Sequence, residues 1–277
     1  MIDIHSHLLP GVDDGAKTIS ESLKILEASA RIGITAISVS PHLYEMDFKE
    51  ETFPKIHRAM QEVKEAALKE GFDIFLSQGY EVYLTDQSHR FVLNHHAFLE
   101  QSGVERKEEK FALIEMPEMS IPMNFLHVLF ELKLSGVTPI IAHPERNALV
   151  ETRFDILDRA FEMGALFQLD AGSILGAFGE SPKLNAEKLL KRRMIHLVGS
   201  DVHNLSSRPV DLLHLSREAI GSRLGDDFYV KSIFVTNPGA VVKGKTVLAH
   251  QFMRQPHEPQ EPQNEPWWKR SLRKWVA

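Results

Sequence analysis

The chain begins with MIDIHSH (residues 1–7), a short apolar run that ends in two histidines. Met1 to Ile4 have the character of a buried β-strand. Because side chains alternate along a strand, His5 and His7 would point to the same side and could hold one metal ion. The alternative is an ordinary pair of polar side chains at a strand end, which these seven residues alone favour.

Similar short apolar runs recur along the chain and alternate with longer stretches of helical periodicity. This alternation is typical of βα units built on a parallel sheet. Seven runs predict an α/β fold in the form of a closed or nearly closed barrel. The predicted strands are Met1–Ile4, Thr35–Ser40, Ile74–Leu76, Phe111–Met116, Val137–Ala142, Ala165–Leu169 and Met194–Val198.

The longer stretches predict helices whose apolar stripes pack in the core. The clearest begins at Thr18, where Thr18 and Glu21 have the spacing of a capping box, and it stops before Gly33. The other predicted helices are Thr52–Glu70, Pro122–Ser135, Phe154–Met163 and Asn185–Arg193.

Histidines and carboxylates fall at or just past the ends of these predicted strands. The carboxyl ends of barrel strands form one face, so residues that are distant in sequence converge there. Burying so many ionisable groups is costly unless they are paired or bind metal, which favours a multinuclear metal site. The remaining histidines, such as His57 and His127, are interpreted as surface or packing residues. The ligand-type residues at these ends are His5, His7, Asp13, Asp14, His42, Glu81, Glu115, His143, Glu145, Asp201 and His203.

Composition excludes several classes of protein. The 277 residues include no cysteine, which rules out disulfides, thiolate metal sites and a cysteine nucleophile. The formal charge of -6 disfavours nucleic acid as a partner, so an anionic substrate must be drawn by a local positive site. The first residues lack the apolar run of a secretory signal, and no window approaches the ~18 apolar residues of a membrane span. We therefore expect a cytoplasmic protein.

The composition changes near residue 250. We expect a catalytic domain over residues 1–250, a linker rich in Pro, Gln and Glu over residues 251–266, and a basic, Trp-rich tail over residues 267–277. The tail could dock weakly on an anionic membrane or a partner, which would place the protein at the inner face of the membrane. The alternative is a frayed terminus.

Together, four phrases resemble those of the PHP (polymerase and histidinol phosphatase) superfamily. They are most similar to its bacterial branch of manganese-dependent tyrosine phosphatases encoded with capsule and exopolysaccharide machinery. The resemblance spans residues 1 to about 204 and implies a distorted (β/α)7 barrel with the metal site at the carboxyl ends of the strands. The phrases are Asp3-Ile4-His5-Ser6-His7, Asp13-Asp14-Gly15, Ala142-His143-Pro144-Glu145-Arg146 and Ser200-Asp201-x-His203-Asn204.

The resemblance also implies three divalent metal ions, with Mn²⁺ favoured and Fe²⁺ or Zn²⁺ as alternatives. Against four carboxylates, three such ions leave an excess of about two positive charges that can attract a phosphate dianion. The implied ligand sets are His5, His7, Glu81 and Asp201 for one ion, Glu81, Glu115 and His143 for the second, and Asp14, His42 and His203 for the third, with Glu81 bridging the first two.

The implied activity is hydrolysis of protein phosphotyrosine by attack of a metal-bound hydroxide. The expected substrate is a membrane-associated bacterial tyrosine kinase that regulates capsule or exopolysaccharide synthesis. We expect Arg146 and Arg208 to bind phosphate oxygens, the alternative being an ordinary rim salt bridge. Asp201 and His203 are counted among the catalytic residues as well as the ligands.

Three other functions remain open at this point. A histidinol-phosphate phosphatase and a PHP exonuclease share the ligand set, although the negative charge argues against the nuclease. A scaffold protein with a vestigial metal site is the third, and the complete ligand set argues against it.

Overall fold

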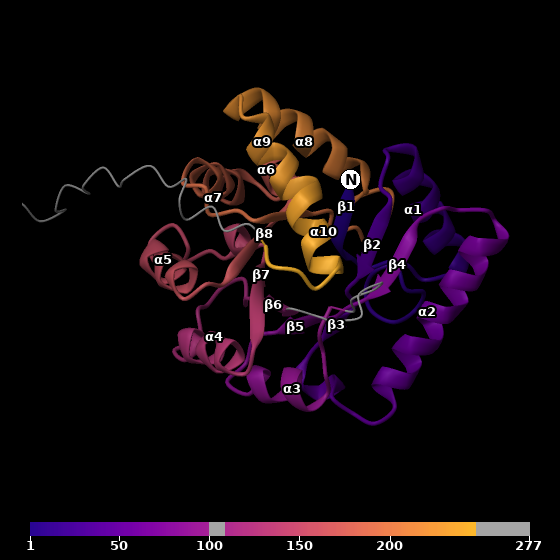
Figure 1. Ribbon diagram of the computed structural model, residues 1–277, viewed down its shortest axis with the longest axis horizontal. Helices are drawn as coiled ribbons and strands as arrows, with labels where there is room; N and C mark the ends of the chain where they lie inside the picture. The colour runs from indigo at the N-terminus through magenta and orange to yellow at the C-terminus, as the bar shows by residue number, and fades with distance from the viewer. Residues whose placement is uncertain (100–108, 248–277) are drawn as a thin grey trace, which may run out of the picture.

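The computed structural model of the protein describes residues 1–99 and 109–247 (Figure 1). Within them, parallel strands lie at the centre and helices surround them. No helix of this part is both long enough and apolar enough to cross a membrane. The strands are β1 (Ile2–Ser6), β2 (Ala36–Val39), β3 (His42–Leu43), β4 (Phe75–Gln78), β5 (Glu81–Tyr83), β6 (Lys110–Glu115), β7 (Val137–Ala142), β8 (Leu166–Asp170) and β9 (Leu197–Gly199). The α-helices are α1 (Ile19–Arg31), α2 (Thr52–Lys69), α3 (Ser88–Asn94), α4 (Phe125–Leu134), α5 (Phe154–Glu162), α6 (Ala171–Leu175), α7 (Glu180–Lys191), α8 (Asp211–Leu224), α9 (Asp227–Lys231) and α10 (Asn237–Val242).

The strands form two sheets, ordered β1-β2-β4 and β3-β5-β6-β7-β8-β9. β3 follows β2 after a break at Ser40-Pro41, where proline has no N–H to donate, and β5 follows β4 after a break at Gly79-Tyr80. Gly79 N donates to Val39 O (2.6 Å) and Glu81 N donates to Pro41 O (3.0 Å), so the two interrupted strands stay side by side. The described residues therefore contain the seven predicted strands. β3 and β5, which continue the second and third of them beyond their predicted ends, were not predicted.

The first and the last strand also meet. Asp201 N donates to His5 O (3.0 Å), and His7 N donates to Val202 O (2.9 Å), so the end of β1 lies beside the segment that follows β9. The parallel strands thus form a distorted barrel, and the predicted α/β class is confirmed.

One apolar cluster fills the inside of the barrel. In Figure 1, α10 crosses in front of the strands, and its Val241 and Val242 pack in this cluster. Further along the same strands the inward residues become polar, because Glu115 lies two residues beyond Leu113 on β6. The apolar side chains and α10 therefore support the polar end of the barrel. Strand residues of the cluster are Ile4, Phe111, Leu113, Ile140, Ala142, Leu166 and Leu197.

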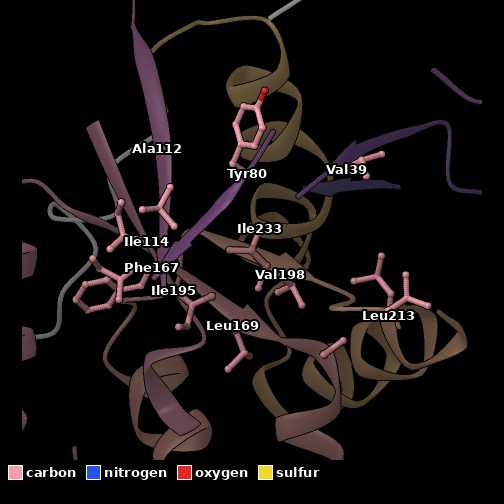
Figure 2. Close-up of a cluster of buried hydrophobic side chains, with 14 of the residues drawn as sticks. Val39, Tyr80, Ala112, Ile114, Phe167, Leu169, Ile195, Val198, Leu213 and Ile233 are labelled. Carbon is pink, nitrogen blue, oxygen red and sulfur yellow. The ribbon is translucent and has the colours of Figure 1, made fainter. Parts of the chain in front are cut away.

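A second apolar cluster lies between the outer faces of the strands and the helices. Figure 2 draws part of it, including Ala112 and Ile114 of β6 and Leu169 of β8. Along β6 the outward residues alternate with Phe111 and Leu113, which face the barrel interior. Buried side chains of this kind contribute roughly 1.5–3 kcal/mol each, so this layer supplies much of the stability that keeps the strand ends in place.

The predicted helices are present, with small changes at their ends. The side chain of Thr18 accepts from Glu21 N (3.2 Å), as predicted, but the carboxylate of Glu21 accepts from Lys17 N (2.7 Å), one residue earlier than a capping box requires. α7 begins at Glu180, five residues before the predicted start, because Pro182 lies in its first turn, where no N–H is needed.

Several elements were not predicted, namely α3, α6, α8, α9, α10 and a π-helical segment, Ser232–Thr236. Their packing against the barrel stabilises them more than local periodicity does. The predicted linker and tail, residues 251–277, lie outside the described residues.

Candidate metal centre

His5 and His7 lie at the end of β1 with their rings buried, and their Nε2 atoms are 3.1 Å apart. The other nitrogen of each ring, Nδ1, makes a hydrogen bond that fixes the orientation of the ring. His5 Nδ1 donates to Gln168 Oε1 (2.9 Å), and His7 Nδ1 donates to Asp13 Oδ2 (2.8 Å). These bonds select the tautomer in which Nε2 carries no proton and can bind a metal ion.

The turn Asp13-Asp14-Gly15 brings a carboxylate over these rings. Gly15 N donates to Asp13 Oδ1 (2.9 Å), and a side chain at Gly15 would collide with the backbone of His7, so only glycine fits. Asp14 is exposed, and its Oδ1 lies 3.2 Å from His203 Nε2 and 3.6 Å from His42 Nε2. The turn thus supplies one orienting carboxylate and one candidate ligand.

Glu81 lies at the centre of the cluster, fully buried. Its Oε2 is 3.1 Å from His5 Nε2 and 3.1 Å from His42 Nδ1, and its Oε1 is 2.9 Å from His143 Nε2. The register of β3 and β5, which pairs His42 with Glu81, causes this approach. A carboxylate whose two oxygens face different imidazoles is placed to bridge two ions.

Asp201 and His203 follow β9. Asp201 Oδ1 lies 3.4 Å from His5 Nε2 and 3.2 Å from His7 Nε2, and His203 Nδ1 lies 2.8 Å from Asp201 O. Asp201 (φ 50°) and His143 (φ 29°) have left-handed backbones, which cost a non-glycine residue about 1–3 kcal/mol. Strain of this kind clusters at functional sites, and here it affects two candidate ligands.

The nine candidate ligands predicted from sequence lie at one end of the barrel. The first implied set is present as a compact group. The group that corresponds to the third implied set also contains His7. The group that corresponds to the second contains His42 in place of His143, and His143 contacts Glu81 instead. The three groups with ligand atoms within 4.8 Å of one another are His5, His7, Glu81 and Asp201; His7, Asp14, His42 and His203; and His42, Glu81 and Glu115.

Electrostatic coupling in the cluster is strong. Burial alone would lower the pKa of His5, but Glu81 and Asp201 outweigh it and raise that pKa to about 9. Burial, together with the charge of Glu81, raises the pKa of Glu115 to about 7. Burial and the neighbouring His7 lower the pKa of His203 to about 4. Bound divalent cations would reduce the repulsion between these carboxylates, because the cations take the place of the protons that the side chains share.

Four buried atoms of the cluster test whether these residues fit metal ions, because none makes a hydrogen bond of regular geometry in the described structure, although some lie 3.1–3.2 Å from one another or from a neighbouring imidazole. Buried polar atoms are nearly always paired, so orphans at one point require another partner. Nitrogen and oxygen ligands without sulfur suit Mn²⁺, Fe²⁺ or Zn²⁺. The residues therefore fit divalent ions. The atoms are His42 Nδ1, Glu81 Oε2, Glu115 Oε2 and Asp201 Oδ1.

Two arginines lie above the cluster. Arg146 donates from Nη1 to Asp201 Oδ2 (2.9 Å) and from Nη2 to the exposed Glu118 (3.0 Å), and Arg208 Nη1 donates to Asp201 Oδ2 (3.4 Å). The ring of Phe178 lies 4.6 Å from the guanidinium carbon of Arg146 and 5.9 Å from that of Arg208. Cation–π contact with the ring of Phe178 keeps both guanidinium groups over the cluster.

A cavity of about 440 Å³ opens above the candidate ligands. Its wall includes Arg146 and Arg208, together with the rings of Tyr44 and Tyr83. A phosphoryl group and an attached side chain are small enough to enter a space of this volume.

Other histidines of the described residues lie away from this cluster. His196 is buried, and its Nδ1 accepts from Phe167 N (3.1 Å), which makes it a packing residue as expected. Sequence reasoning missed the roles of Gln168, Phe178 and the two tyrosines. The tyrosines stand two residues after His42 and Glu81, a spacing that could have revealed them.

Comparison with known proteins identifies the family. A family model described as "Capsular polysaccharide synthesis, CpsB/CapC" matches residues 1–243. Tyrosine-protein phosphatase YwqE of Bacillus subtilis (strain 168) is 29% identical over 267 residues, which cover 94% of this chain and 96% of that protein. Tyrosine-protein phosphatase CpsB of Streptococcus pneumoniae is 31% identical over 254 residues, covering 89% of this chain and all of that protein.

Comparison with solved structures indicates the same family. A structure from a study of YwqE and CpsB, described as metal-dependent tyrosine phosphatases, superposes with a TM-score of 0.78 at 27% identity and covers 94% of this chain and 100% of its own. A variant organophosphorus hydrolase from Deinococcus radiodurans, at 14% identity and a TM-score of 0.50, covers 87% of this chain and 92% of its own and shares the fold alone. The resemblance to the tyrosine-phosphatase branch of the PHP superfamily is therefore confirmed, and the chain belongs to the CpsB/CapC family of capsular polysaccharide synthesis.

Proposed function

We propose that this chain is a metal-dependent phosphatase that removes phosphate from tyrosine residues of a protein. One observation carries the proposal: nine ligand-type side chains gather at the carboxyl ends of the barrel strands, below a cavity whose wall holds two arginines. The names of its relatives support the substrate class, since YwqE and CpsB are tyrosine-protein phosphatases.

The proposed cofactor is a set of three divalent ions, with Mn²⁺ as the favoured metal. Glu81 would bridge the ions, and the orphaned oxygens of Glu115 and Asp201 would complete their coordination. Such ions, when bound, supply a water of lowered pKa and neutralise charge on the phosphoryl oxygens. The ligands are His5, His7, Asp14, His42, Glu81, Glu115, His143, Asp201 and His203.

The two arginines bind the substrate's phosphoryl oxygens. Arg146 Nη2 contacts the exposed Glu118, a carboxylate that a phosphate can displace, while Nη1 stays on the buried Asp201. Arg208 contributes a second fork next to His203. Because both guanidinium groups pack on Phe178, they reach the phosphate with little loss of side-chain entropy. Tyrosinate is a fairly good leaving group, which reduces the need for a strong general acid.

The proposed substrate protein is a membrane-associated bacterial tyrosine kinase that regulates capsule or exopolysaccharide synthesis. The enzyme would act in the cytoplasm, as one catalytic domain over residues 1–250. The linker over residues 251–266 and the basic, Trp-rich tail over residues 267–277 would allow weak association with the inner face of the membrane.

Turnover by the full-length, manganese-loaded chain tests this function. We expect hydrolysis of a phosphotyrosine peptide in strong preference to histidinol phosphate and a DNA 3′ end, loss of activity with a chelator, and recovery with Mn²⁺. His5→Ala should abolish turnover, whereas His57→Ala, at an exposed position on α2, should not. Full activity of the folded His5→Ala protein, or preference for one of the other two substrates, would contradict the proposal.

A further inference from the structure

Two tyrosine rings stand at the mouth of the cavity above the candidate ligands. The ring centroids of Tyr44 and Tyr83 are 5.4 Å apart, and Tyr44 stacks on the ring of His42 with centroids 5.7 Å apart. Tyr44 is 42% exposed, so it does not belong to the apolar core. The rings therefore present an open aromatic surface to the cavity.

The sheet register explains why these rings lie together. β3 and β5 pair His42 with Glu81 and Leu43 with Val82, so the next row along the two strands holds Tyr44 beside Tyr83. Side chains two residues apart on a strand point to the same side. Each tyrosine thus extends the wall of the cavity directly outward from a candidate ligand.

The exposure of the side chains increases from the candidate ligands toward the two tyrosine rings. His5, His7 and Glu81 at the bottom are fully buried, Arg146 is 12% exposed and Tyr44 is 42% exposed. A phosphoryl group bound by the arginines therefore leaves its ester substituent at the level of the two rings. A substituent that is itself flat and aromatic can pack there, whereas a short alkyl substituent cannot cover the same surface.

Two further residues that line the cavity are also suited to contact with an aromatic ring. Pro117 and Met119 line the same cavity, and the side chain of Met119 is 76% exposed. A thioether adapts its shape readily and makes favourable contacts with ring edges. The wall of the cavity therefore offers an aromatic substituent both tyrosine rings and a flexible thioether.

We propose that Tyr44 and Tyr83 form a binding subsite for the aromatic leaving group and give the enzyme its preference for aryl over alkyl phosphates. This inference rests on the proposed phosphatase function and assigns the specificity of that site to two residues that are neither ligands nor phosphate-binding groups. Aromatic contacts, together with the buried ring surface, predict a preference of about tenfold.

Equilibrium binding of non-hydrolysable ligands tests the subsite without turnover. Isothermal titration calorimetry on the manganese-loaded, full-length chain compares phenylphosphonate with methylphosphonate. The wild type should bind the phenyl compound about tenfold more tightly. Tyr44→Ala/Tyr83→Ala should reduce that ratio to less than about twofold, whereas Tyr44→Phe/Tyr83→Phe, which keeps both rings, should retain it. Phe228→Ala, at an exposed position on α9, serves as the control and should also retain the ratio.

Manganese content of each variant separates specificity from damage to the metal site, because both tyrosines lie close to candidate ligands. If the alanine variant binds less metal, Tyr44→Leu/Tyr83→Leu, which keeps apolar bulk without rings, is measured in its place and should lose most of the preference. A wild type that binds both phosphonates equally, or a metal-replete variant without rings that keeps the full ratio, overturns the subsite. Failure to hydrolyse a phosphotyrosine peptide while the phenyl preference persists would overturn the proposed function alone.

Discussion

Replacing Asp13 with asparagine should weaken manganese binding without removing a ligand. Asp13 Oδ2 accepts from His7 Nδ1 (2.8 Å) and from the backbone N–H of His42 (3.2 Å), while Oδ1 accepts from Gly15 N (2.9 Å). Although burial alone would raise the pKa of Asp13, its bond to His7 holds that pKa well below the ordinary value. Asparagine keeps the shape and loses the charge that makes His7 Nε2 a strong ligand.

Loss of one such outer contact typically costs about 10- to 100-fold in metal affinity, which is about 1.4–2.7 kcal/mol. The assay is a manganese titration of phosphotyrosine-peptide hydrolysis, with metal content measured after desalting. Asp13→Asn should need about 10- to 100-fold more Mn²⁺ for half-activation and should approach wild-type turnover at saturation. Asp73→Asn, at an exposed site before β4, is the matched control. An unchanged manganese requirement, or inactivity at saturating metal, would refute this role for Asp13.

Three further changes give distinct outcomes. Arg146→Ala should lower kcat/KM for aryl phosphates by about 100-fold at unchanged metal content, and unaltered kinetics would remove Arg146 from phosphate binding. Gly15→Ala should lower the free energy of unfolding by about 1–3 kcal/mol in urea, because the methyl group meets the backbone of His7, whereas Gly221→Ala, with open space around it on α8, should not. Burial raises the pKa of Glu145 from 4.5 to about 7, so the stabilising effect of its bound proton is complete below pH 4.5 and lost as the pH rises through about 7. Glu145→Gln, which mimics the protonated form, should therefore gain stability relative to wild type between pH 5 and pH 8, and parallel urea profiles would contradict this.

The convergence of the candidate ligands at one end of the barrel could be predicted because their sequence signal is local. His5 and His7 stand at strand spacing after a short apolar run, and the later candidates fall where a parallel barrel must bring strand ends together. Whether His143 or His42 shares a group with Glu115 depends on the register of β3 and β5, which no local pattern encodes. The grouping of the ligands therefore required the structure.

The parts that escaped prediction are stabilised by contacts between distant segments. α10 is a short helix whose Val241 and Val242 are buried only because the barrel interior accepts them. Phe178 follows a left-handed glycine at Gly176, and only the fold reveals that its ring meets Arg146 and Arg208. Residues of this kind carry no sequence pattern, since their partners are more than 25 residues away or come from loops.

Anomalous diffraction at the manganese edge, from crystals of the manganese-loaded chain, tests the central claim most directly. We expect three peaks at the carboxyl ends of the strands, with the carboxylate of Glu81 between two of them and the oxygens of Glu115 and Asp201 in contact with the ions. Manganese bound elsewhere, or loaded crystals with no peak beside Glu81, would contradict the account.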